Sequence, residues 1–262
     1  MPAATIVSSK GRASPTPAVP AVPLRARWIV VPLLIAIVLI AIDHTTDMDR
    51  TLTRWAYDAQ TRTFPLRTAF WLDVVMHHWT KDVVITLGGL LAAALVVSSI
   101  LPVLSGQRLV LLFVVLAMSL APLAVTLAKS VSARHCPWDI DEFGGLVPYT
   151  RMFEPAVPDS PAGHCFPAGH ASTGFALLAL YFAAYANGRK KAARIALAVG
   201  LGAGLALGFG RVLQGAHFPS HVLWSGLLCW VVMVLLYRLV LRKKLGSDAN
   251  FLKGSERARR PS

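Results

Sequence analysis

Residues 210–221 read GRVLQGAHFPSH and join two apolar runs, at 194–213 and 220–241, that are each long enough to cross a bilayer. Ionisable side chains are costly in lipid and usually line a polar site, so Arg211, His217 and His221 indicate such a site where two membrane helices meet. The stretch therefore predicts a helical membrane protein with a functional site at the ends of its helices.

Four further apolar windows lie near residues 28–42, 83–104, 109–128 and 169–187. With the first two they predict an all-α bundle of six transmembrane helices, in keeping with a composition that is 55% hydrophobic. Under this interpretation residues 25–243 form the membrane domain, between flexible cytoplasmic tails at residues 1–24 and 244–262.

The formal net charge of +13 follows from membrane topology rather than from nucleic-acid binding. With an inside N-terminus, 17 of the 26 Lys and Arg residues fall on the inner side, against only Asp248 and Glu256 of the 13 acids. Cytoplasmic segments of membrane proteins carry such an excess of positive residues. We expect a multi-pass protein of a bacterial inner membrane with both termini in the cytoplasm and no nucleic-acid partner.

Three connections then face outward, at residues 43–82, 129–168 and 214–219. The first contains WAYDAQTRTFPLRTAFWLDVVMHHW, residues 55–79, in which aromatic and charged residues alternate at roughly helical spacing. This pattern predicts an amphipathic element at the membrane surface. Its role is either a packing lid over the bundle or a path for lipid access.

Polar residues at the outer ends of three predicted spans form the candidate site. Lys129 ends the third span, FPAGH at 166–170 opens the fourth, and GRVLQGAHFPSH joins the fifth to the sixth. Lys129 and Arg211 supply positive charge for phosphate oxygens, and Gly169 can turn backbone amides toward an anion. Two histidines can divide phosphoryl transfer, one attacking phosphorus and the other protonating the leaving alcohol.

These residues resemble the type 2 phosphatidic acid phosphatases, which share a site with the vanadium haloperoxidases. The pattern of that family is K-x6-R-P, then P-S-G-H, then S-R-x5-H-x3-D. Here its parts correspond to Lys129 with Cys136-Pro137, to PAGH at residues 167–170, and to residues 210–221. The resemblance covers roughly residues 80–240 and includes the six-helix plan.

The resemblance implies that His217 is the nucleophile that forms a phosphohistidine, that His170 is the general acid, and that Lys129 and Arg211 bind phosphate. It implies no metal and no other cofactor. The expected substrate is a lipid phosphate such as phosphatidate, phosphatidylglycerol phosphate, undecaprenyl diphosphate or a lipid A phosphate. The alternatives are a phosphotransferase with a lipid acceptor and a transporter that recognises anionic lipids without catalysis.

The sequence departs from the family pattern at four positions, where Cys136, Ala168, Gly210 and His221 replace Arg, Ser, Ser and Asp. Arg134 is either a substitute phosphate ligand or a solvated loop residue. If His217 and His221 both lie in the first turns of the last helix, their i, i+4 spacing places them on one face. His221 could then accept the proton on the far nitrogen of His217.

Cys136 and Cys165 each adjoin a motif in the same outward loop, where oxidising conditions favour a disulfide between them. Two free thiols are one alternative. A zinc site completed by His135 and His164 is another, although the spacing is not that of a standard zinc motif.

Glycines at positions 200, 204 and 208 recur every four residues along the fifth span. Small residues at this spacing allow a second helix to approach closely. Residues 200–208 therefore predict either a homodimer contact or, more commonly, packing within the same chain.

Overall fold

The computed structural model describes residues 25–158 and 160–241 of the 262-residue chain, and these residues form an all-α fold. The predicted tails at residues 1–24 and 244–262 lie outside this described part. The α-helices are α1 (Arg27–Thr45), α2 (Met48–Arg54), α3 (Thr80–Ile100), α4 (Arg108–Ser130), α5 (Gly169–Phe175), α6 (Leu178–Ala186), α7 (Lys190–Leu213) and α8 (Pro219–Leu236). Two π-helical segments, Trp71–Trp79 and Tyr237–Leu241, precede α3 and follow α8. Short 3-10 turns lie at Pro102–Gln107, Pro137–Asp139 and Asp141–Phe143.

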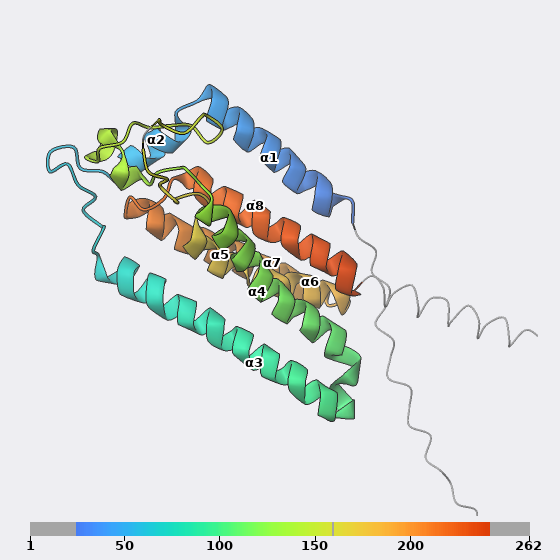
Figure 1. The fold of residues 1–262 in the computed structure, drawn as a ribbon. Coiled ribbons are helices and arrows are strands. Elements are labelled where there is room, and N and C mark those ends of the chain that lie inside the picture. Colours follow the sequence, from blue (N-terminus) through green and yellow to red (C-terminus); the bar gives the residue numbers. More distant parts are fainter. Residues whose placement is uncertain (1–24, 159, 242–262) are drawn as a thin grey trace, which may run out of the picture.

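The long helices lie alongside one another in a single bundle (Figure 1). The short helix α2 and the loop between α4 and α5 cover one end of this bundle, which we call the loop end. The described chain begins and finishes at the opposite end. All of the long connections are therefore gathered at one end, where the three polar motifs can meet.

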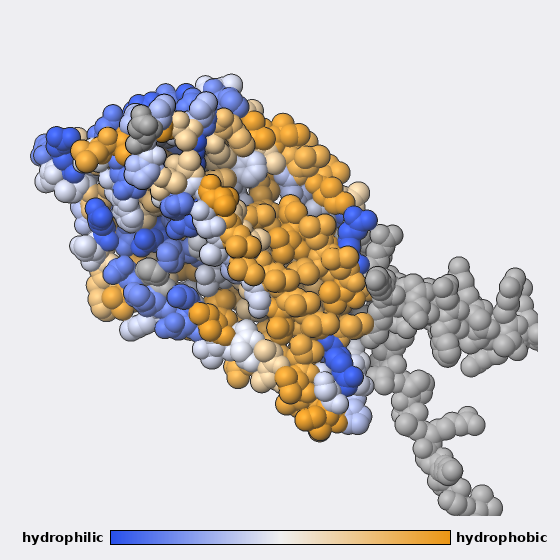
Figure 2. All heavy atoms as spheres, viewed as in Figure 1, coloured by the Kyte–Doolittle hydropathy of each residue, from blue (hydrophilic) through white to orange (hydrophobic). Residues whose placement is uncertain are grey.

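Within the described residues, five helical segments are long and apolar enough to cross a membrane: Arg27–Thr45, Trp71–Ile100, Pro102–Ser130, Lys190–Leu213 and Pro219–Leu241. Their outward-facing side chains are apolar, as for Leu33 and Val83, which are 58% and 66% exposed. Figure 2 shows a continuous hydrophobic surface over the helices, with hydrophilic residues concentrated at the loop end. These features are those of a multi-pass membrane protein.

The predicted fourth span, residues 169–187, is not one long helix. It consists of α5 and α6, separated by a tight turn at Ala176 and Leu177 in which the hydrogen bonds tighten to i→i+3, as from the Leu177 amide to the Gly174 carbonyl at 3.1 Å. Both short helices pack along α7. The predicted count of six long spans is thus replaced by five long helices and one broken segment.

The amphipathic stretch at residues 55–79 also differs from the prediction in its second half. Trp71–Trp79 runs directly into α3 and belongs to the same 30-residue candidate span, rather than forming a separate surface helix. It packs against α7, where Leu72 and Met76 lie beside Gly210. The apolar side chains of this stretch therefore cover the end of α7 that carries the site.

The small residues of α7 pack within the chain. A methyl group on Gly204 would lie 2.2 Å from the ring of Phe175. Gly200 and Gly208 are similarly filled by Leu178 and Val222. The face at residues 200–208 is thus occupied by α5, α6 and α8, so the structure supports packing within the chain. This face is not available for a homodimer contact, and a homodimer remains an untested prediction.

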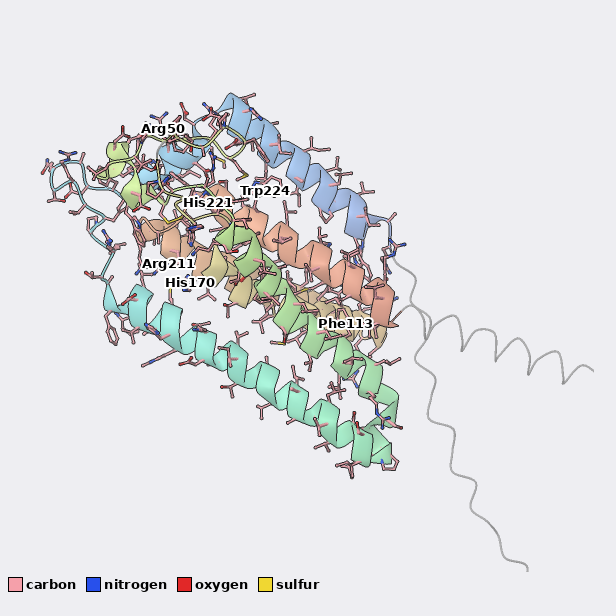
Figure 3. All side chains as sticks on the ribbon, in the orientation of Figure 1. Arg50, Phe113, His170, Arg211, His221 and Trp224 are labelled. Carbon is pink, nitrogen blue, oxygen red and sulfur yellow. A yellow bond between two sulfur atoms is a disulfide. The ribbon has the colours of Figure 1, made fainter. Side chains whose placement is uncertain are left out.

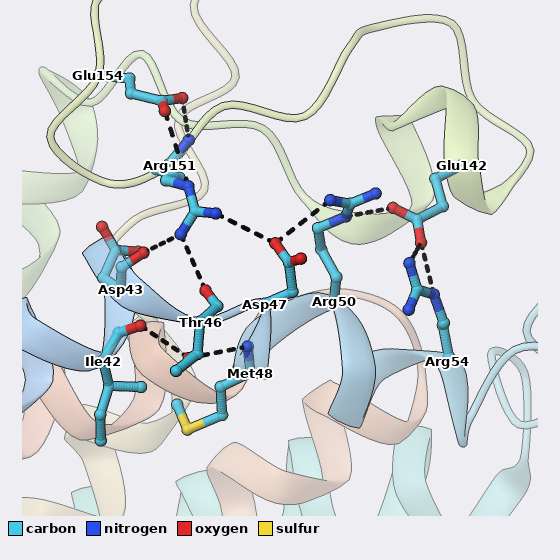
Figure 4. A network of polar contacts seen from close by, with 10 residues as sticks. All are labelled: Ile42, Asp43, Thr46, Asp47, Met48, Arg50, Arg54, Glu142, Arg151 and Glu154. Atoms are coloured by element: carbon cyan, nitrogen blue, oxygen red, sulfur yellow. Dashed lines mark hydrogen bonds and ion pairs between the residues drawn. The ribbon is translucent and has the colours of Figure 1, made fainter.

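Ion pairs join α2 to the loop between α4 and α5 (Figure 4). Arg50 and Arg54 each donate to the carboxylate of Glu142 at 2.6 Å. Arg151 contacts Asp47 at 3.2 Å and also donates to the backbone carbonyl of Asp43. These contacts hold the N-terminal segment over the loop end of the bundle.

Candidate active site

The three predicted motifs meet at the loop end of the bundle. Lys129 lies in the last turn of α4, Gly169 and His170 begin α5, and Arg211 lies in the last turn of α7. Figure 3 shows His170, Arg211 and His221 gathered at this end, away from Phe113 in the core toward the other end. The fold therefore brings together residues that are more than 80 positions apart in the sequence.

The turn between α7 and α8 places His217. Gly215 adopts a left-handed conformation with φ of 72°, and a methyl group there would lie 2.4 Å from the Phe64 ring. Pro219 then starts α8, and Phe218 before it is extended, with ψ of 154°. Because proline favours the first helical position and disfavours a helical residue before it, the helix cannot reach back to His217.

His217 is buried, with 2% of its surface exposed, and the other polar groups of the site surround it. Burial lowers the pKa of this imidazole well below its usual value, and His221, Lys129, His170 and Arg211 lower the pKa further by charge repulsion. Each of these four groups is therefore close enough to act on the His217 ring. The expected consequence is a neutral imidazole at physiological pH.

The neighbours of His217 also indicate its tautomer. Its Nδ1 lies 3.5 Å from the sulfur of Cys165, which is bonded to Cys136 and so can only accept a hydrogen bond. The proton of the neutral ring is then on Nδ1, and the lone pair is on Nε2. This leaves Nε2 as the nitrogen able to attack an electrophile.

His221 lies in the first turn of α8 and is held by the backbone. Its Nδ1 is 3.2 Å from the carbonyl oxygen of Cys165, which can only accept, so Nδ1 is the donor. The condition under which both histidines would share one helical face is not met, since His217 precedes α8. The two rings are nevertheless neighbours, with centroids 5.9 Å apart.

Arg211 is held by a hydrogen bond to Gln214, and its Nε remains for a ligand. Its Nη1 donates to the Gln214 side chain at 2.8 Å, and Gln214 in turn donates to the backbone carbonyl of Arg67 at 3.1 Å. The buried Nε of Arg211 has no acceptor among the described residues. Lys129 is close enough to repel Arg211, as expected of two cations arranged around one anion site.

The region beside Gly169 is open. A methyl group built on this residue would meet no atom within 4 Å. The next residue, His170, is the second of α5 and acts electrostatically on His217. Open space and a histidine therefore lie together at the N-terminus of α5, and Lys129 and Arg211 act on the same His217 ring.

Arg134 is engaged by the loop that follows it. Its guanidinium donates to the backbone carbonyls of Arg151 and Glu154, at 2.6 and 2.9 Å, and to the hydroxyl of Thr150 at 2.9 Å. These contacts describe an arginine that stabilises the loop. Its suggested role as a phosphate ligand stays a prediction that this geometry does not favour.

The predicted disulfide is present. Cys136 and Cys165 are bonded, with Cα atoms 5.2 Å apart, and the bond links the loop after α4 to the segment before α5. It also removes the thiolates that a zinc site with His135 and His164 would require. The cluster of Cys165, His217 and His221, whose ligand atoms lie within 4.8 Å of one another, can offer only two imidazoles for the same reason.

Gln214 is a site residue that the sequence analysis missed. It is buried at 1% exposure and connects Arg211 to the segment before α3. A signal for it was present, because it is the only amide side chain within GRVLQGAHFPSH and directly follows the apolar second half of α7.

Comparison with known proteins agrees with the predicted resemblance. Residues 110–245, slightly more than half of the 262 residues, match the PAP2 superfamily. The match contains all three motifs. No curated protein and no solved structure matched the chain. Together with the family match, the gathering of Lys129, His170, Arg211 and His217 at one end of a bundle with five membrane-length helices leads to one conclusion: this chain belongs to the PAP2 superfamily of phosphatase-type hydrolases.

Proposed function

We propose that the protein is a membrane lipid phosphatase that hydrolyses a phosphate monoester or diphosphate of a lipid through a phosphohistidine on His217. The observation that carries this proposal is the position of His217, buried among Lys129, His170, Arg211 and His221. A neutral imidazole surrounded by cations is suited to attack a phosphorus atom whose oxygens those cations hold.

In the first step, Nε2 of His217 attacks phosphorus and the bond to the leaving oxygen breaks. Lys129 and Nε of Arg211 bind the non-bridging oxygens and stabilise the charge that spreads over them. His170 donates a proton to the departing oxygen, so that the lipid leaves as a neutral alcohol or a protonated phosphate.

In the second step, a water molecule attacks the phosphohistidine, and His170, now unprotonated, takes the proton from that water. Inorganic phosphate leaves, and His217 regains its original state. His221 assists by packing beside the His217 ring, whose centroid lies 5.9 Å from its own, while its Nδ1–H is committed to the carbonyl of Cys165. His221 supplies less charge than a carboxylate would, and we expect a slower enzyme rather than an inactive one.

A lipid substrate is supported by the position of the site at one end of the apolar helices. We propose that α5 and α6 together make the sixth crossing, since residues 169–186 span about 27 Å at helical rise, close to the thickness of a bilayer core. With an even number of crossings, both ends of the chain lie on the same side of the membrane. The excess of Lys and Arg on that side indicates that it is the cytoplasmic side. The site would then face the periplasm.

The test is an assay of phosphate release by purified protein against phosphatidate, phosphatidylglycerol phosphate, undecaprenyl diphosphate and lipid A, with and without a chelator. We expect release from at least one lipid, unchanged by the chelator and abolished in His217→Ala. Transfer of labelled phosphate to a second lipid would instead assign a phosphotransferase. Release that survives in His217→Ala would remove the nucleophile from the proposal.

A further inference from the structure

Asp49 is a buried carboxylate that the proposed reaction does not use. It lies on α2, is 8% exposed, and contacts α8 across 171 residues of sequence. One carboxylate oxygen accepts the backbone N–H of Ser220 at 2.9 Å, and the other accepts the Ser220 hydroxyl. No apolar packing role explains a carboxylate at this place.

These contacts replace a missing helix cap. The N-cap residue of α8 is Phe218, which has no side-chain acceptor, and Pro219 has no N–H. The amide of Ser220 is therefore the first donor of α8 that needs a partner, and Asp49 supplies it from another helix. A negative charge at the beginning of an 18-residue helix is also favoured by the helix dipole.

The start of α8 that Asp49 holds carries one histidine of the site and closely follows the other. His217 lies three residues before Ser220 and His221 directly follows it. Asp49, Ser220 and His221 line one polar cavity of about 10 Å³, the size that holds a single water molecule. On its other side the turn is tied to the segment before α5, because the Ala168 amide donates to the His221 carbonyl at 3.2 Å.

Holding an ionised carboxylate in this place is unfavourable in itself. Burial raises the pKa of Asp49 to about 6; the hydrogen bonds from Ser220 oppose this effect, and the nearby Asp43 adds to it. A charge that costs stability is consistent with a role in which its position matters more than its contribution to folding.

We propose that Asp49 is a positioning residue for the phosphatase reaction: it caps α8 from outside and thereby fixes His217 and His221 relative to Lys129 and Arg211. The inference rests on the proposed function. Asp49 touches no reacting atom and is not a catalytic residue. It lies outside residues 110–245, so this site would depend on a segment that the family match does not contain.

The experiment compares full-length wild-type protein, Asp49→Ala and Asp49→Asn in detergent micelles, with dioleoyl phosphatidate and p-nitrophenyl phosphate as substrates. We expect Asp49→Ala to lower kcat about 20-fold while KM changes less than about 3-fold, since the phosphate ligands remain but the nucleophile is misplaced. Asp49→Asn keeps an acceptor for the Ser220 amide and should recover kcat to within about 3-fold of wild type.

The matched control is Asp47→Asn, which removes an acid from the same segment without touching α8 and should leave kcat unchanged. Hydrogen exchange of the Ser220 and His221 amides gives a readout independent of activity and should be faster in Asp49→Ala only. Wild-type kcat in Asp49→Ala would overturn the proposal. Equal kcat losses in Asp49→Ala, Asp49→Asn and Asp47→Asn, following a common loss of melting temperature, would overturn it as well.

Failure of the proposed function would look different. If the wild-type protein released no phosphate from any substrate, the phosphatase would be refuted while the exchange data still reported on the cap. In that case unchanged exchange in Asp49→Ala would overturn the capping, and faster exchange would support it. If Asp49→Ala does not fold, Ser220→Ala carries the test, because it removes the hydroxyl donor to Asp49 and should lower kcat while Asp49→Asn stays within about 3-fold of wild type. Wild-type kcat in Ser220→Ala would then overturn the proposal.

Discussion

The sulfur of Cys165 lies 3.5 Å from Nδ1 of His217, so the disulfide is in direct contact with the ring assigned as nucleophile. The backbone carbonyl of the same cysteine accepts from His221. One residue thus orients both imidazoles, and the covalent bond to Cys136 fixes that residue in turn.

Breaking the disulfide should therefore affect stability and activity separately. Cys136→Ala and Cys165→Ala each remove the cross-link, which for a loop of this length contributes about 3 to 4 kcal/mol. Both variants should show the same fall in melting temperature. Only Cys165→Ala also removes the sulfur from His217, so its kcat should be about tenfold below that of Cys136→Ala. Identical kcat values would show that the sulfur contact has no role.

The role of His170 as general acid predicts a dependence on the leaving group. His170→Ala should lower kcat/KM, which reports the steps up to departure of the leaving group, about 10³-fold for phosphatidate, whose alkoxide must be protonated as it leaves. The loss should be far smaller for p-nitrophenyl phosphate, because p-nitrophenolate leaves without a proton. The measurement is the steady-state rate with each substrate. His217→Ala is the control and should lose activity toward both substrates. Equal losses for the two substrates would argue against proton donation by His170.

The position of Gln214 predicts control of phosphate affinity. Gln214→Glu places a carboxylate beside Arg211, where it should pair with the guanidinium and compete with the substrate. We expect KM and the inhibition constant of inorganic phosphate to rise about tenfold, with a smaller change in kcat. Gln214→Met, similar in volume but uncharged, is the control. A Gln214→Glu enzyme with unchanged phosphate inhibition would place the phosphate elsewhere.

The lowered pKa of His217 predicts the acid side of the pH profile. Because burial and four neighbouring groups favour the neutral ring, the nucleophile stays unprotonated as the pH falls below 6.5. The acid limb of kcat/KM should therefore lie clearly below pH 6.5.

The lowered pKa of His217 also predicts that the free energy of unfolding decreases as the pH falls below about 6.5, since the unfolded chain then binds the proton more readily than the folded one. Thermal unfolding of wild type and His217→Asn across pH 5 to 8 tests this, and the variant should lack that part of the acid destabilisation.

Much of the site was predictable because its chemistry is local to short motifs. Lys129, Gly169, His170 and Arg211 lie at helix ends as expected, since each adjoins an apolar run whose length sets where the helix stops. The Cys136–Cys165 bond was predictable from two cysteines in one outward loop.

Other features depend on contacts that a linear pattern does not contain. The break between α5 and α6 lies within the apolar run FALLAL, residues 175–180, and the helix ends there by tightened hydrogen bonds rather than at a proline or polar residue. The separation of His217 from α8 is predictable from Pro219, because proline favours the first position of a helix. Asp49 carried no signal at all, because its partner Ser220 lies 171 residues away.

The most direct measurement is to trap the intermediate. Wild-type protein mixed with ³²P-labelled phosphatidate and quenched in alkali, in which phosphohistidine survives, should carry label on the peptide containing His217 and on no other histidine. His217→Ala should carry none, while His170→Ala supplied with a labelled aryl phosphate should retain it. Label on His170 or His221, or rapid phosphate release without any labelled protein, would contradict the account.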